Sequence, residues 1–226
     1  MALKSVQIME AVERLLKTIP PDVTLVAAAK GRSIEEVKAA IQAGVEHVGH
    51  NYVQEAKPII EALGDRANWH MIGHLQRNKA AAAVRLFDMI ETVDSVKLAE
   101  AIDLRCARLG KTIPVLVEVN SGRERTKTGV LPEELDDLVI GITKMKHIRL
   151  MGLMTMGPRF GDPEDARPFF KATREAFERL SALRLKNVSL RYLSMGMTNS
   201  YQVAIEEGAN LLRIGTKIFG PREEEV

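Results

Sequence analysis

The feature that most constrains the fold of this chain is a regular alternation of short apolar segments with longer amphipathic ones. The short segments are rich in Val, Ile, Leu and Ala, as buried strands are, and all but the last precede a segment of helical periodicity. Eight strands are predicted at an interval of about 25 residues, over residues 23–30, 46–51, 68–73, 89–93, 113–120, 148–156, 190–194 and 211–214. Strands that alternate with helices pair in parallel through right-handed crossovers, so an α/β protein with a parallel sheet is predicted.

The number of strand-helix units favours a closed (β/α)8 TIM barrel over an open, doubly wound sheet. Open sheets more often have fewer strands and a glycine-rich first turn, whereas the first turn here, residues 30–33, reads Lys-Gly-Arg-Ser. The amphipathic segment 5–17 ahead of the first strand predicts an extra amino-terminal helix. Because no linker-like segment interrupts the pattern, we expect a single domain over residues 1–226.

Composition excludes several classes of partner. The net charge is +2 without a run of like charges, and aromatic residues make up only 4% of the chain. Such a chain offers neither a basic stripe nor a stacking platform, so no nucleic acid is expected as partner. No segment has the length of a signal peptide core or a membrane span, and the single cysteine, Cys106, falls in a helical pattern. A cytoplasmic protein with no membrane partner is therefore predicted.

A lysine closes the first predicted strand, Val23–Lys30. Side chains alternate along a strand, so Val26, Ala28 and Lys30 share one face. Lysine is seldom buried without a partner, and a desolvated amine is a nucleophile. Taken alone, the stretch favours a lysine that marks the exit of the strand into solvent. The other predicted strands and loops are needed to distinguish a buried, reactive amine from a solvent-exposed lysine.

Two loops in the carboxyl-terminal part of the chain have the composition of an anion site. In barrels of this kind the loops after the seventh and eighth strands often hold a phosphate. Here the loops 194–200 and 213–216 combine glycines, which let backbone N–H groups approach an anion, with hydroxyl side chains. Ordinary strand-exit turns use the same residue types. Their recurrence on neighbouring strands favours the phosphate site.

Barrel closure brings the eighth strand, which carries Arg213, against the strand that carries Lys30. A lysine, an arginine and a phosphate cradle around one opening favour a phosphorylated carbonyl ligand held as a Schiff base. Pyridoxal 5'-phosphate (PLP) is the leading candidate. A sugar-phosphate aldolase would use the same pair, but it would usually need carboxylates inside the opening, and Glu118 and Asp94 are the few inward acidic candidates.

Several segments, in order along the chain, resemble those of the pyridoxal-phosphate homeostasis proteins, and the resemblance runs from Val23 to Arg222. The matching segments are Ala29-Lys30 and residues 49–55, 69–79, 152–154, 194–197, 213–216 and 218–220. That family folds as a single barrel like the amino-terminal domain of the alanine racemases. The resemblance therefore implies one PLP-binding TIM-barrel domain.

The resemblance also implies roles for the candidate residues. Lys30 would form the Schiff base with PLP, Asn51 would line the cofactor pocket, and Arg213 would lie near the pyridine nitrogen. The residues implied around the phosphate are Ser194, Gly196, Met197, Gly215 and Thr216. No further catalytic residue and no metal ligand are expected.

An arginine beside the pyridine nitrogen disfavours its protonation, which makes the ring a poorer electron sink. A racemase also needs a second acid or base, which in alanine racemases is a tyrosine from another domain of a partner subunit. None of the three tyrosines, Tyr52, Tyr192 and Tyr201, stands in a matching context. The hypothesis is therefore a monomeric carrier for intracellular PLP homeostasis, with the apo forms of PLP-dependent enzymes as candidate acceptors. A PLP-dependent amino-acid racemase or a lysine-dependent aldolase is the alternative.

One residue departs from the family pattern: His50 stands where the family usually has Glu. If Asn51 points into the barrel opening, residue 50 points toward the helices. The histidine pairs 47/50 and 70/74 do not predict a metal site, because no cysteine or carboxylate cluster completes one. The strand-exit lysines Lys79 and Lys127 are expected to be solvated or paired with nearby acids.

Overall fold

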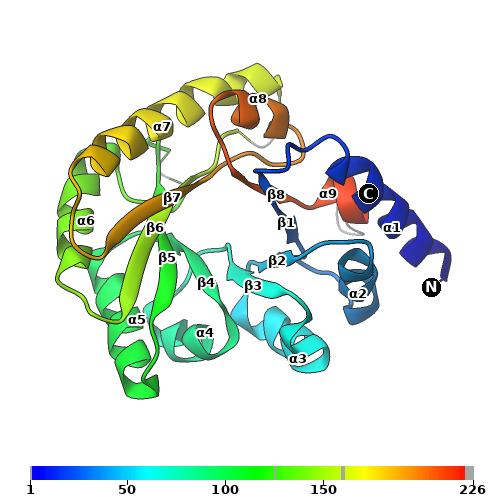
Figure 1. The fold of residues 1–226 in the computed structure, drawn as a ribbon, viewed down its shortest axis with the longest axis horizontal. Helices are drawn as coiled ribbons and strands as arrows, with labels where there is room; N and C mark the ends of the chain where they lie inside the picture. Colours follow the sequence, from blue (N-terminus) through cyan, green and yellow to red (C-terminus); the bar gives the residue numbers. More distant parts are fainter. Residues whose placement is uncertain (1, 125, 159–160, 222–226) are drawn as a thin grey trace.

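The computed structural model describes residues 2–124, 126–158 and 161–221, and shows a closed barrel of parallel strands that follow one another around the ring in chain order (Figure 1). Its strands are β1 Thr24–Ala28, β2 His47–His50, β3 Asn68–Met71, β4 Met89–Val93, β5 Ile113–Val119, β6 Ile148–Thr155, β7 Val188–Ser194 and β8 Leu211–Ile214. Pairing of β8 with β1 closes the ring. The predicted (β/α)8 TIM barrel is confirmed. Arg222, at the end of the family resemblance, lies outside the described residues.

Helices surround the strands as an outer layer (Figure 1). The α-helices are α1 Ala2–Leu16, α2 Ile34–Gln42, α3 Val53–Leu63, α4 Ala80–Leu86, α5 Val96–Leu109, α6 Leu135–Thr143, α7 Arg167–Ala182, α8 Tyr201–Glu206 and α9 Thr216–Phe219. The short 3-10 helices are η1 Gly64–Arg66, η2 Arg77–Lys79, η3 Pro132–Glu134 and η4 Pro163–Ala166. The predicted extra amino-terminal helix is α1, which packs against α2 and α9. Within the described ranges no helix has the length and apolar character that a membrane span requires.

Side-chain caps mark the starts of two of the helices. Ser33 and Glu36 form a capping box at α2: the Glu36 amide donates to Ser33 Oγ at 3.3 Å, and the Ser33 amide donates to Glu36 Oε2 at 2.8 Å. Ser95 caps α5 by accepting a hydrogen bond from the Leu98 amide at 3.3 Å. These contacts satisfy amides that have no partner within their own helix.

The apolar residues divide between two places. Most of the core lies between the outer face of the barrel and the helices, and it includes Trp69, Phe87 and Phe170. Two small clusters, separate from that main core, are built from residues on the strands or directly after one: Val26, Ile72 and Leu211, and Met89, Leu116 and Met154. Alternation along each strand assigns its side chains to these two sides.

The first strand is shorter than predicted, and the difference matters for the site. The ladder between β1 and β2 ends at the pair Ala28 and Gly49, so Lys30 lies two residues beyond the strand. The Ala29 amide still donates to the Gly49 carbonyl at 2.8 Å, which holds the exit segment against β2. Lys30 therefore begins a loop at the carboxyl end of the barrel, where functional groups of this fold collect.

Candidate cofactor-binding site

A cavity of about 550 Å³ lies at the carboxyl ends of β1, β2, β7 and β8. Its volume is within the range of small-molecule and cofactor sites. The lining combines apolar side chains with a few polar ones: Ala28, Lys30, Arg32, Asn51, Ile72, Met156, Gly161, Met197, Thr198, Asn199, Arg213, Gly215 and Thr216.

Most of the predicted binding residues line this cavity, and two of them do not. The residues brought together are Lys30, Asn51, Met197, Arg213, Gly215 and Thr216. Ser194 is fully buried behind the wall. Gly196, with φ of +95°, packs against α8, where a Cβ would come within 2.6 Å of the Ala204 Cβ. Glycine is needed there for close packing of the loop, and its backbone carbonyl accepts from the Arg213 amide at 3.0 Å.

Lys30 presents an uncommitted amine to the cavity. Its side chain is half-buried, and Nζ lies 5.2 Å from the centre of the Tyr52 ring. Among the described residues, Lys30 Nζ makes no hydrogen bond or ion pair. The amine is therefore held near an aromatic face while remaining free to react with a ligand.

Two loops form a polar wall beside this lysine. Met197, Thr198 and Asn199 come from the loop after β7, and Gly215 and Thr216 follow β8. The Lys217 amide donates to Thr198 Oγ1 at 3.4 Å, which joins the two loops. A Cβ on Gly215 would approach the Ala28 carbonyl oxygen at 3.0 Å, so the second loop lies tightly against β1. Close-packed backbone and hydroxyl groups of this kind suit an anionic oxygen.

Arg32 is a lining residue that the sequence reasoning missed. Its Nη2 donates to the Gly220 carbonyl at 2.5 Å and its Nη1 donates to the Phe219 carbonyl at 3.3 Å, so it holds the end of α9. A basic residue directly after the Lys30-Gly31 exit from the first strand was the available signal. Its charge adds to the preference of this wall for an anion.

Arg213, on β8, is buried within the lining, with only 4% of its surface exposed. Its Nη2 donates to the Thr155 carbonyl at 2.8 Å, and its Nη1 donates to Ser194 Oγ. Burial lowers the pKa of the Arg213 guanidinium, and the nearby Glu91 and Glu118 carboxyl groups oppose that shift. The guanidinium keeps its charge because arginine is not deprotonated in proteins.

A chain of polar side chains continues from Ser194 through the barrel interior. Ser194 Oγ donates to Glu91 Oε2 at 2.6 Å, Glu91 Oε1 lies 2.7 Å from His70 Nδ1, and His70 Nε2 lies 2.9 Å from His47 Nδ1. Burial alone would raise the pKa of Glu91, but the His70 and Ser194 hydrogen bonds and the charge of Arg213 bring it below its usual value.

The sequence did not predict this network of polar side chains. Spacing in the sequence paired His47 with His50 and His70 with His74, whereas the parallel register of β2 and β3 brings His47 and His70 together. The available signal was Glu91 itself, a glutamate in the middle of the short strand β4.

The inward acids considered in the sequence do not line the cavity. Glu118 Oε1 accepts from Thr128 Oγ1 at 2.7 Å, and burial raises the pKa of its carboxyl group. Asp94 Oδ2 lies 3.3 Å from His74 Nδ1. Among the described residues of the lining, the ionisable side chains are Lys30, Arg32 and Arg213, with no carboxyl, imidazole, thiol or phenol group.

The remaining residues of interest lie away from the cavity. His50 is fully buried and stacks on Trp69 in the outer core at a ring distance of 6.0 Å. Lys127 pairs with Glu124 at 2.5 Å as expected, and Lys79 lines a second cavity of about 310 Å³. In the described part of the chain no group of three or more His, Cys, Asp or Glu side chains could hold a metal ion.

Comparisons with known proteins agree with this geometry. The family model "Alanine racemase, N-terminal domain" matches residues 7–223. The pyridoxal phosphate homeostasis protein of Aquifex aeolicus is 39% identical over 208 residues, which cover 92% of this chain and 85% of that protein. A structure of PipY from Synechococcus elongatus with PLP bound has 32% identity and a TM-score of 0.86, with coverage of 94% of this chain and 100% of that one.

A more distant neighbour shares the fold alone. Alanine racemase from Corynebacterium glutamicum has 17% identity and a TM-score of 0.78, over 96% of this chain and 61% of that one. The family model covers the whole barrel with its cavity, and the curated relative matches 92% of the chain. The chain therefore belongs to the pyridoxal phosphate homeostasis proteins, which share the barrel of the alanine racemase amino-terminal domain.

Proposed function

We propose that the protein binds PLP reversibly in the cavity at the carboxyl end of its barrel and serves PLP homeostasis inside the cell, without robust catalysis. The observation that carries the proposal is the uncommitted Lys30 amine, which shares one cavity with a polar loop wall and a buried arginine. The name of the Aquifex aeolicus relative and the PLP bound in the PipY structure support it.

The lining fits the cofactor group by group. The amine of Lys30, once it has lost its proton to solvent, would add to the aldehyde carbon, and loss of water would leave a carbon-nitrogen double bond. The polar wall of Thr198, Asn199, Gly215 and Thr216 would hold the phosphate, with the charge of Arg32 beside it. Asn51 lines the cavity from the end of β2 and would contact the ring.

Arg213 determines what kind of ring nitrogen can face it. A guanidinium has only donors, so its partner across the cavity has to be an acceptor, which is an unprotonated pyridine nitrogen. Bound PLP supplies an electron sink for carbanions, and that sink is weaker when the ring nitrogen carries no proton. Arg213 therefore favours holding the cofactor over using it.

The lining also explains why we propose a carrier and not an enzyme. Racemisation needs an acid or base on each side of the substrate carbon, and an aldolase also needs proton transfer at its substrate. Apart from Lys30, the ionisable groups among the described lining residues are arginines, which remain protonated. Delivery to apo PLP-dependent enzymes, a monomeric state and a cytoplasmic location stay predictions.

An absorption spectrum tests the proposal directly. The purified protein incubated with PLP should develop the visible band of a lysine-bound cofactor, and Lys30→Ala should lack it. Lys79→Ala and Lys127→Ala are the matched controls, because both remove a lysine near strand exits without touching the lining, and both should keep the band. A band that persists in Lys30→Ala refutes the role of Lys30. Sustained turnover of amino acids or aldehydes that depends on Lys30 would refute the carrier and favour the racemase or aldolase.

A further inference from the structure

The polar chain inside the barrel joins two openings of the fold. His47 is the first residue of β2 and is partly exposed, whereas Arg213 lines the cavity at the carboxyl ends of the strands. Between them His70, Glu91 and Ser194 are each at most 2% exposed. Five strands contribute one side chain each, since His70 lies on β3, Glu91 on β4 and Ser194 on β7. Because the barrel fixes the positions of these five strands, it also fixes the positions of the five side chains relative to one another.

The hydrogen atoms along this chain follow from the chemistry of Glu91. A carboxylate only accepts, so His70 Nδ1 and Ser194 Oγ must both donate to it. The single hydroxyl hydrogen of Ser194 is then committed, and its oxygen is left to accept from Arg213 Nη1. Ser194 thus bridges an ion pair whose charged atoms, Arg213 Nη1 and Glu91 Oε2, are 4.0 Å apart.

The bridge leaves part of the guanidinium available to a ligand. Arginine has five N–H donors. The side-chain bonds of Arg213 in the described structure go to Ser194 and the Thr155 carbonyl, and neither residue lines the cavity. The remaining donors have no protein acceptor among the described residues, although the side chain forms part of the lining.

Other charges near Arg213 do not replace Glu91. Glu118 on β5 also acts on Arg213 through its charge, but burial raises its pKa and so favours its neutral form. Its hydrogen bond goes to Thr128 and not to Ser194 or Arg213. His70 and His47 reach Arg213 only through Glu91. Glu91 is therefore the carboxylate that both balances the guanidinium charge and is joined to it through the hydrogen bonds of Ser194.

We propose that Glu91 is a positioning residue for the cofactor site, which acts through Ser194 to hold Arg213 against the ring nitrogen with its charge balanced. The inference rests on the proposed function, because the ring nitrogen belongs to PLP. It adds to that function an internal residue that touches neither the cofactor nor the cavity. It also gives Ser194 the role of a buried bridge between Arg213 and Glu91, in place of a contact with the phosphate.

The hydrogen-bond directions can be tested without the cofactor. In the apo-protein, imidazole 15N chemical shifts should show His70 protonated at Nδ1, because Glu91 needs a donor there. In Glu91→Gln this signature should change, and in Glu118→Gln it should stay as in the unchanged protein. A His70 ring without a proton on Nδ1 in the unchanged protein would overturn the proposal, whatever the protein does with PLP.

The PLP-loaded full-length protein supplies the second test. In Glu91→Gln the visible band should still form, because Lys30 is intact, but the PLP dissociation constant should rise about tenfold or more. The pH midpoint at which the band titrates should fall by about one unit, since the unbalanced Arg213 charge disfavours the protonated form. Glu118→Gln, which removes another buried glutamate, should leave both values within about twofold and a few tenths of a unit.

Ser194→Ala separates position from charge and also covers the case in which Glu91→Gln does not fold. It keeps both charges and removes only the bridge, so the dissociation constant should rise by at least about threefold with an unchanged titration midpoint. Affinity and midpoint equal to those of the unchanged protein in folded Glu91→Gln, or equal affinity in Ser194→Ala, would overturn the proposal. Absence of the visible band from the unchanged protein would instead refute the proposed function.

Discussion

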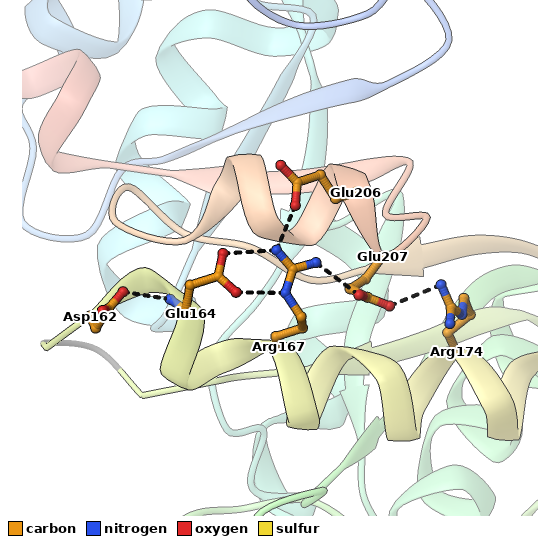
Figure 2. A network of polar contacts seen from close by, with 6 residues as sticks. All are labelled: Asp162, Glu164, Arg167, Arg174, Glu206 and Glu207. Atoms are coloured by element: carbon orange, nitrogen blue, oxygen red, sulfur yellow. Dashed lines mark hydrogen bonds and ion pairs between the residues drawn. The ribbon is translucent and has the colours of Figure 1, made fainter.

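Two arginines of this barrel show how differently the same side chain is used inside and outside the fold. Arg167 on α7 lies at the surface between α7 and α8, where carboxylates surround it (Figure 2). Its Nε donates to Glu164 at 2.6 Å, Nη2 to Glu206 at 2.6 Å and Nη1 to Glu207 at 3.0 Å. Arg213, inside the barrel, has a hydroxyl and a carbonyl as its partners.

The two environments differ in the energetic cost of an N–H donor that has no protein partner. At the surface water satisfies any donor that the protein leaves free, so the Arg167 pairs contribute little individually. Inside the barrel a donor without a partner is costly. The free N–H groups of Arg213 are therefore informative, and they indicate that the cavity wall is built for an acceptor.

The surface network still bears on the site through the loops that it connects. Asp162 caps η4 by accepting from the Glu164 amide at 3.0 Å, and Arg167 ties this segment to the end of α8 (Figure 2). Both segments follow loops that line the cavity, one at Gly161 and one at Asn199. Asn199 Nδ2 donates to the Gly161 carbonyl at 3.0 Å, which joins those loops directly.

The largest effect is expected from removing the buried cation. Arg213→Leu leaves the Glu91 carboxylate inside the barrel without its charge partner, so the free energy of unfolding should fall by about 3–5 kcal/mol. Urea unfolding of the apo-protein measures this change. The double variant Arg213→Leu with Glu91→Gln should recover part of the loss, because it removes the stranded charge. A loss below about 1 kcal/mol would mean that the two arginine environments do not differ as described.

His50 sharpens the comparison because it is a buried polar side chain without a hydrogen-bond network in the described part of the chain. Burial lowers its pKa to about 4, and among the described residues both ring nitrogens lack hydrogen-bond partners. Well above pH 6.5 the ring is neutral in both states. Between pH 6.5 and 4 only the unfolded chain takes up the proton, so this residue should lower the free energy of unfolding by about 3 kcal/mol as the pH falls.

The measurement compares unfolding at several pH values in the unchanged protein and in His50→Leu. As the pH falls from 6.5 to 4, the unfolding free energy of the unchanged protein should fall relative to that of His50→Leu by about 1.4 kcal/mol per pH unit. His74→Gln is the matched control, since the His74 side chain is 49% exposed and its replacement leaves the buried His50 ring in place. A parallel pH dependence in His50→Leu would show that the His50 ring is not held neutral.

The smallest effect is expected at the surface. Arg167→Gln should lower the melting temperature by only about 2 °C or less, and the difference should shrink further in 1 M salt, where exposed charges are screened. The Arg213→Leu loss should barely respond to the same salt, because solvent ions do not reach the buried pair. If salt reduced the stability loss equally in Arg167→Gln and Arg213→Leu, the surface and buried arginines would not differ as described.

Much of the cavity was predictable because it depends on local patterns and strand order. Alternation along β1 predicted the face of Lys30, and the order of the strands predicted that Arg213 and the loop at Gly215 would lie beside it. Met156 was missed as a lining residue, because methionines at strand exits have no distinctive pattern. Thr198 was expected only as one of the hydroxyl residues of the loop 194–200. The position of Ser194 at the phosphate stays a prediction, and in this structure its Oγ donates to Glu91 Oε2.

The sequence by itself determined the barrel, the caps of α2 and α5, and the lysine and arginine at one opening. These follow from periodicity and from contacts between residues close in the chain. Only the tertiary structure decided that Glu91 meets Ser194, which lies 103 residues away, and that His47 meets His70. The physical reason is that the register and closure of the barrel choose which inward side chains touch, and no local pattern encodes that choice.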